Sequence, residues 1–170
     1  MEQTKKLVVC AVFIALGVVL GGLLNIPAVV FGAYSVKIGF GVLPVILAGM
    51  LYGPVYGGMV GGLTDFLQAV IFPKGAYEPW FTIIGIFFGL IPGLFFMKKQ
   101  PFKFWRIFLA VAAGQIFSSV ICNSILMVKL YGLTYDIFYV RAVNQAVMIP
   151  LYSVICYYLL NKVLNKILKR

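Results

Sequence analysis

The stretch PWFTIIGIFFGLIPGLFFM, residues 79–97, decides the fold class of this chain. It carries no charged side chain, and its length suits a helix that crosses the roughly 30 Å hydrocarbon core of a bilayer. The rest of the chain is similar, with 63% hydrophobic and 11% charged residues and a mean hydropathy of +1.06. A soluble domain of 170 residues could not bury that much apolar surface. The sequence therefore predicts an all-α membrane protein.

Apolar runs of this kind recur along the chain and predict a single integral membrane domain over residues 1–170. We expect a bundle of six transmembrane helices. Their predicted bounds are 5–24, 37–51, 54–72, 79–97, 104–131 and 135–168. The second helix is short, and the last two exceed the thickness of a bilayer, so we expect them to tilt or to project from it.

Basic residues predict the orientation of the bundle. Lys5 and Lys6 lie at the start of the first helix, four basic residues lie between 98 and 106, and four lie between 162 and 170. With six helices these clusters fall on one side, which the positive-inside rule assigns to the cytoplasm. We therefore expect cytoplasmic N- and C-termini in a prokaryotic plasma membrane. The net charge of +10 follows from this topology, and short clusters at a membrane edge do not favour a nucleic-acid partner.

The sequence lacks the residues that metal binding, ATP hydrolysis and several kinds of catalysis need. The sequence has no histidine, and Cys10, Cys122 and Cys156 are scattered, so we expect no metal, no cofactor and no disulfide framework. It has no G-x-x-x-x-G-K-[ST] motif, so the chain cannot hydrolyse ATP through a Walker motif. A membrane enzyme is disfavoured because paired carboxylates and a metal cluster are both missing.

Polar side chains gather in the outer half of four predicted helices, while the inner half is almost wholly apolar. This asymmetry predicts a pocket that opens outward, because a pore would need polar lining at all depths. The alternatives are a structural ion pair between Asp65 and Arg141 and an oligomeric channel-like or structural protein. The polar residues are Lys37, Asp65, Gln68, Asn123, Arg141, Asn144 and Gln145.

Aromatic residues stand in the predicted outer loops over 25–36 and 72–80. Phe31 and Tyr34 lie in the first loop, and Tyr77 and Trp80 lie in the second. They can form an interfacial belt, or they can stack on a planar ligand. Small residues spaced four apart, such as Ala11 and Ala15, predict helix faces that approach closely, either inside the bundle or against a membrane partner.

Four blocks of the sequence resemble the substrate-binding S components of energy-coupling factor (ECF) vitamin transporters, most closely the folate-specific branch. The blocks are VKIGFGVLPVILAGMLYGP (36–54), GGMVGGLTD (57–65), FPKGAYEPWFT (72–82) and RAVNQAVMIP (141–150). The resemblance implies high-affinity binding of a vitamin, folate first, from outside the cell. It also implies docking on a membrane T component that two separate ATPase subunits drive. Pantothenate or another vitamin is the alternative ligand.

The resemblance also implies roles for individual residues. Ala11 and Ala15 match the two-alanine motif that contacts the T component, and Lys37 replaces the family's arginine at the start of the second helix. For a pterin ring, whose N–H pair suits a carboxylate, Asp65 is the candidate acceptor. The expected substrate-binding residues are Phe31, Tyr34, Lys37, Asp65, Gln68, Tyr77, Trp80, Asn123, Arg141, Asn144 and Gln145. Among them, the aromatic residues would stack on the ring, the amides would bond to it, and Lys37 and Arg141 would meet a carboxylate of the ligand.

Overall fold

The computed structural model describes the chain except for residues 1, 24, 32–33, 74–76, 98–101 and 165–170. For residues 2, 25–31, 34–38 and 162–164 it describes the backbone alone. The elements in chain order are α1 (Glu2–Leu23), β1 (Asn25–Phe31), β2 (Tyr34–Gly39), α2 (Val42–Tyr52), α3 (Pro54–Ile71), α4 (Pro79–Phe95), α5 (Phe104–Gln115), η1 (Ile116–Cys122), α6 (Asn123–Tyr131), α7 (Asp136–Tyr158) and η2 (Leu159–Leu164).

Among the residues that the structure describes, three helical runs are long and apolar enough to cross a membrane by themselves. They are Gln3–Leu23, Phe104–Tyr131 and Asp136–Asn161, and the apolar helices α2 and α4 are shorter. The run Phe104–Tyr131 joins α5 and α6 through η1, a π-helical segment. Such segments are rare and often lie at functional sites, and this one leads directly into Asn123.

A β-hairpin between α1 and α2 corrects the sequence prediction. The second helix was predicted to begin at Lys37, but Lys37 lies in β2 and α2 begins at Val42. Strands β1 and β2 pair in antiparallel register from Asn25↔Gly39 to Phe31↔Tyr34. The β-branched residues in this stretch favour a strand, and β2 ends at Gly39, shortly before α2 begins. The all-α prediction therefore omitted this hairpin.

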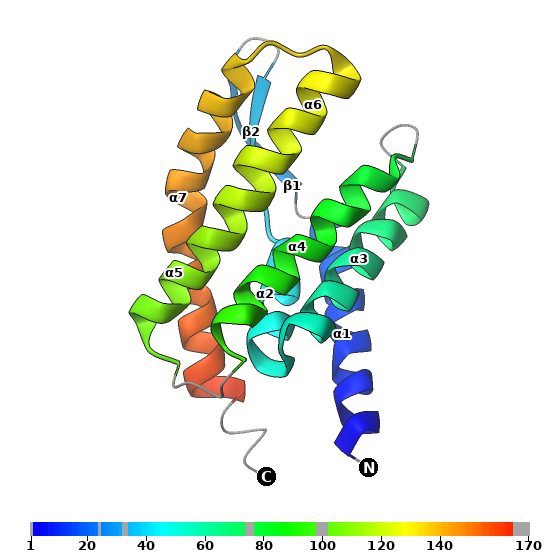
Figure 1. The fold of residues 1–170 in the computed structure, drawn as a ribbon, viewed down its shortest axis with the longest axis vertical. Helices are drawn as coiled ribbons and strands as arrows, with labels where there is room; N and C mark the ends of the chain where they lie inside the picture. The colour runs from blue at the N-terminus through cyan, green and yellow to red at the C-terminus, as the bar shows by residue number, and fades with distance from the viewer. Residues whose placement is uncertain (1, 24, 32–33, 74–76, 98–101, 165–170) are drawn as a thin grey trace.

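The glycine faces of α3 and α4 pack against each other. A Cβ atom added to Gly61 would overlap the carbonyl oxygen of Gly85, and one added to Gly89 would overlap that of Gly57. The two backbones can approach this closely only because side chains are absent, which is the usual role of small residues in membrane helix pairs. This contact fixes α4 beside α3, as Figure 1 shows.

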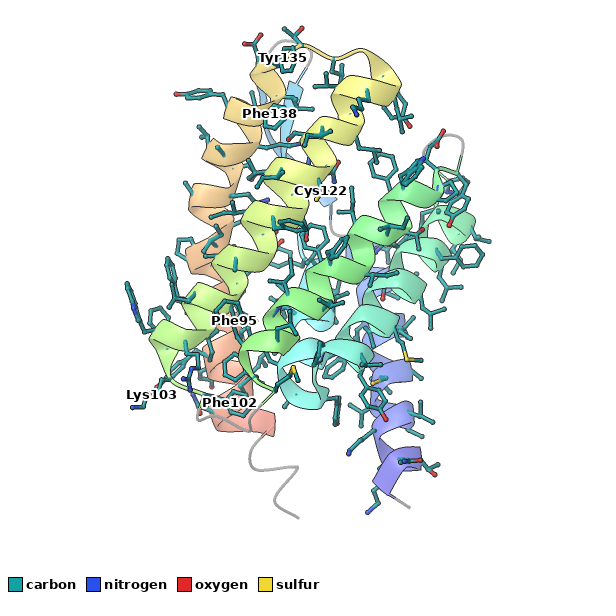
Figure 2. The ribbon with its side chains drawn as sticks, in the orientation of Figure 1. Phe95, Phe102, Lys103, Cys122, Tyr135 and Phe138 are labelled. Atoms are coloured by element: carbon teal, nitrogen blue, oxygen red, sulfur yellow. The ribbon has the colours of Figure 1, made fainter. Side chains whose placement is uncertain are left out.

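The two ends of the molecule differ. Figure 1 shows that α1 begins at the same end where η2 stops, and Phe102 and Lys103 lie at that end in Figure 2. Tyr135 and Phe138 lie at the opposite end, near the hairpin. The hydroxyl of Tyr152 on α7 donates a hydrogen bond to the carbonyl oxygen of Gly39, which ties the end of β2 to α7.

Candidate functional site

A cavity of about 160 Å³ lies among α1, α2, α3, α4 and the start of α6. Its polar side chains are Thr64, Asp65, Gln68 and Asn123, and its aromatic side chains are Phe81 and Phe88. Glycines and the apolar side chains of Val42, Val45 and Ile84 line the remainder. The structure therefore brings three of the predicted binding residues, Asp65, Gln68 and Asn123, to one cavity.

Helix α3 supplies polar groups to the cavity from one face. Gly57 and Gly61 face α4, whereas Thr64 and Gln68, one turn apart, face α1. The side-chain amide of Gln68 donates a hydrogen bond to the carbonyl oxygen of Gly17, with a nitrogen–oxygen distance of 3.0 Å. Gln68 therefore also joins α3 to α1, in addition to lining the cavity.

The carboxylate of Asp65 is held from α4. The hydroxyl of Thr82 donates to Asp65 Oδ2 at 2.9 Å. The same hydroxyl oxygen lies 2.9 Å from the hydroxyl of Tyr77. Asp65 is half-buried, so this bond offsets part of the cost of keeping a carboxylate at this depth. Its second oxygen, Oδ1, takes no part in these bonds.

The alternative of an ion pair between Asp65 and Arg141 is not observed. Within the part of the chain that the structure describes, no salt bridge joins these two residues. Arg141 lies on α7 and is partly buried, and its Nε atom has no hydrogen-bond partner among the described residues. The two charges are therefore held apart, and each has groups that a ligand could meet.

A side-chain hydrogen bond joins the η1–α6 run to α7. The side-chain nitrogen of Gln145 donates to the hydroxyl of Ser119 at 2.8 Å. Asn123 lies one turn beyond Ser119, and Arg141 lies one turn before Gln145. Because the two helices run in opposite directions (Figure 1), this register brings Asn123 and Arg141 to the same level.

Within the described residues, several polar atoms near the Gln145–Ser119 hydrogen bond have no hydrogen-bond partner. Asn123 Oδ1 and Gln145 Oε1 are both buried without one. Because the first of these atoms belongs to a residue that lines the cavity, a ligand donor could satisfy it. Asn144 lies on α7 beside Gln145, but the described lining of the cavity does not include it.

The predicted stacking residues are not in the cavity lining that the structure describes. Tyr77 and Trp80 are 45% and 57% exposed. Tyr77 instead packs edge-on against Phe66 of α3, with ring centroids 5.6 Å apart. Phe81 and Phe88 take the place of these aromatics in the cavity, and sequence reasoning missed them. Their spacing of seven residues, two helical turns, puts them on one face and was the available signal.

The hairpin carries three further predicted residues. Phe31 lies at the end of β1, and Tyr34 and Lys37 lie in β2, with Lys37 opposite Pro27 in the register. Their side chains are outside the described structure. Their roles toward a ligand stay predictions.

Ala11 and Ala15 are exposed on α1, with Val8, Val12 and Val19 also exposed nearby. Gly17 and Gly21 on the same helix pack inward, toward Thr64 and Gln68. The two-alanine face is therefore left out of the internal packing of the bundle. Among the described residues, no cluster of three or more His, Cys, Asp or Glu side chains could hold a metal ion.

Comparisons with known proteins identify the family and the fold. Residues 5–168 match the family described as the ECF transporter, substrate-specific component. Two curated relatives are each named Folate transporter FolT. One, from Clostridium novyi (strain NT), is 31% identical over 158 residues, which are 92% of this chain and 88% of the relative. The other, from Leuconostoc mesenteroides, is 26% identical over 165 residues, which are 94% of this chain and 86% of the relative.

Two solved structures share the fold. The crystal structure of FolT bound with folic acid superposes with a TM-score of 0.78 at 26% identity, over 94% of both chains. A structure described as the S component of a bacterial ECF transporter superposes with a TM-score of 0.68 over 99% of both chains. The second is 21% identical and bears on the fold alone.

Proposed function

This chain belongs to the family of substrate-specific components of ECF transporters, and we propose that it binds folate in the cavity around Asp65 and delivers it to a transport complex. It is a multi-pass membrane protein. The observation that carries the proposal is a carboxylate that lines a cavity among membrane helices, in a fold that superposes on FolT bound with folic acid.

The pterin ring of folate matches the groups of the cavity. Asp65 Oδ1 and Asn123 Oδ1 are acceptors for the ring's N–H groups. Phe81 and Phe88 provide aromatic surface for its faces. A cavity of about 160 Å³ is smaller than the roughly 300–1,000 Å³ of pockets for drug-sized ligands, so it takes the ring and leaves the remainder outside.

The glutamate part of folate carries carboxylates, and cationic side chains would bind them. Arg141 stands at the level of Asn123 by register, and Lys37 lies in the hairpin that joins α1 to α2. Arg141 offers donors in a fork that suits a carboxylate, and Lys37 offers a single ammonium group. In this proposal the two residues bind the glutamate part of folate, while Asp65 accepts hydrogen bonds from the pterin ring.

The topology belongs to the proposal as well. We place six membrane spans with both termini in the cytoplasm, because α1 begins and η2 stops at the end of the molecule where Lys103 lies. The hairpin and the α6–α7 connection then face outward. The cavity is nearer to that side, as a protein that captures a vitamin from outside requires.

Energy for uptake comes from other subunits. Ala11 and Ala15 form an exposed small-residue face on α1, and in this proposal that face docks on the membrane T component. Two separate ATPase subunits then drive transport. This chain has no ATPase activity of its own in the proposal.

Titration calorimetry on the purified protein tests the ligand. We expect saturable one-to-one binding of folic acid and no saturable binding of pantothenate. Binding of pantothenate alone would keep the transport function and reassign the cavity to another vitamin. Binding of neither, together with ion conductance in planar bilayers, would favour a channel-like protein instead.

A further inference from the structure

Three side chains form one hydrogen-bonded chain that ends at the carboxylate of Asp65. Tyr77 precedes α4, Thr82 lies in its first turns, and Asp65 is on α3. The Tyr77–Thr82 and Thr82–Asp65 bonds are both 2.9 Å long. Asp65 lines the cavity, whereas the described lining includes neither Tyr77 nor Thr82. Tyr77 and Thr82 therefore reach Asp65 from the side that faces away from the cavity.

The direction of the hydrogens in this chain follows from simple counting. A threonine hydroxyl has one hydrogen, and Thr82 gives it to Asp65 Oδ2. An ionised carboxylate can only accept, so the donor cannot be reversed. The hydroxyl of Tyr77 must then donate to Thr82. Both hydrogens point toward the charge, and this is the arrangement in which each bond strengthens the next.

The surroundings of Thr82 explain why its hydroxyl has one orientation. Thr82 also lines an apolar groove of about 480 Å³ on a second face of α3 and α4, together with Gly62, Phe66 and Ile86. Its methyl group faces Gly62 in that groove. Because a β-branched side chain is stiff about χ1, the rotamer that turns the methyl group toward Gly62 also aims the hydroxyl at Asp65.

We propose that Thr82 is a positioning residue for substrate recognition, which fixes the Asp65 carboxylate so that Oδ1 faces the cavity, with the Tyr77 hydroxyl holding Thr82 in turn. This inference rests on the proposed role of Asp65 in binding the pterin ring. It gives Tyr77 a role through its hydroxyl, in place of the stacking role that the sequence predicted. Asp65 without this bond could rotate about χ1 and χ2 and present its oxygens in several orientations.

Two substitutions each remove one hydroxyl of this hydrogen-bonded chain and keep the shape of the side chain. Thr82→Val retains the methyl group that faces Gly62. Tyr77→Phe retains the edge-on contact with Phe66. Matched controls are Thr4→Val on an exposed threonine of α1 and Tyr157→Phe, whose exposed ring makes a similar edge-on contact with Phe104 at 5.8 Å.

The test uses two ligands, folic acid and its 2-desamino analogue, which lacks the exocyclic amine that would donate a hydrogen bond to the carboxylate. We expect Thr82→Val to weaken folic acid binding about tenfold and to leave binding of the analogue nearly unchanged. Thr82→Ser, which keeps the hydroxyl but lacks the methyl group that orients it, restores the affinity for folic acid in part, and Tyr77→Phe has a smaller effect than Thr82→Val in the same direction. Both controls bind as the wild type does.

Different outcomes overturn different statements. Equal weakening of both ligands by Thr82→Val, or unchanged binding of folic acid, would show that the hydroxyl only joins α3 to α4 and would overturn the inference. If Thr82→Val does not fold, Tyr77→Phe decides by the same comparison, since its side chain is exposed. Failure of the wild type to bind folic acid would overturn the proposed function itself, and the inference with it.

Discussion

The side-chain amide of Gln68 donates to the carbonyl oxygen of Gly17, 3.0 Å away, and crosses from α3 to α1 where Gly21 has no side chain. A Cβ atom at Gly21 would overlap the amide of Gln68. The bond therefore depends on a glycine one turn away from its acceptor. It holds the wall of the cavity that α1 provides.

Gly21→Ala is expected to displace Gln68 and to lower both the unfolding temperature and the affinity for folate. The added methyl group must move an amide that is packed between two helices, and overpacking of this kind costs about 1–3 kcal/mol. Thermal unfolding in detergent measures the effect. Gln68→Ala in the same chain should recover part of the loss, because it removes the overlap; purely additive effects of the two substitutions would contradict this account.

Asp65→Asn is expected to weaken folate binding tenfold or more, because a charge-assisted hydrogen bond contributes about 1.5–3 kcal/mol. The amide keeps the size of the side chain and can still accept from Thr82. Titration calorimetry measures the affinity, and Asp136→Asn, on an exposed acid at the start of α7, is the control. An affinity equal to that of the wild type would remove Asp65 from the binding site.

Arg141→Met is expected to weaken folate much more than pteroate, which lacks the glutamate part. The methionine keeps an unbranched side chain among the neighbours of Arg141 but has no donor for a carboxylate. Competition between the two ligands on the purified variant gives the ratio directly. A similar loss for both ligands would assign Arg141 to the packing of α7 rather than to the ligand.

Ala11→Trp and Ala15→Trp are expected to abolish uptake while leaving folate binding intact. Both alanines are exposed, so a large side chain disturbs a docking face and not the interior of the bundle. Uptake of labelled folate by cells and binding by the purified variants measure the two properties separately. Ala146→Trp, at an exposed alanine of α7, should affect neither. Loss of binding in the α1 variants would make this face part of the internal packing.

The sequence predicted the helical architecture and part of the cavity for physical reasons that can be named. Asp65 was identified because burying a carboxylate among apolar membrane residues costs free energy, so such a residue usually has a functional role. Residues 25–36 were predicted as an outer loop, and the second helix was predicted to start at Lys37 because the apolar residues after it continue into α2. A one-dimensional pattern could not separate a short strand pair from the start of α2.

Other parts of the site depend on packing that no single sequence reveals. Phe81 and Phe88 face the cavity, while Trp80, next to Phe81, is exposed. Which of several aromatics on an apolar helix faces inward is decided by the glycine contact of α3 with α4. The partner of Asp65 likewise proved to be Thr82, a neutral residue, because α4 lies closer to it than the charge on α7 does.

The backbone contact between α3 and α4 also bears on how such a protein can diversify over generations. Gly57, Gly61, Gly85 and Gly89 leave no side chains that could adjust to a substitution, so variants at this seam are expected to be eliminated. Side chains that line the cavity outside the seam, such as Phe81 on α4 and Asn123 on α6, are freer to vary. Lineages that acquire a new nutrient preference are therefore expected to inherit the seam unchanged and to mutate the walls around it.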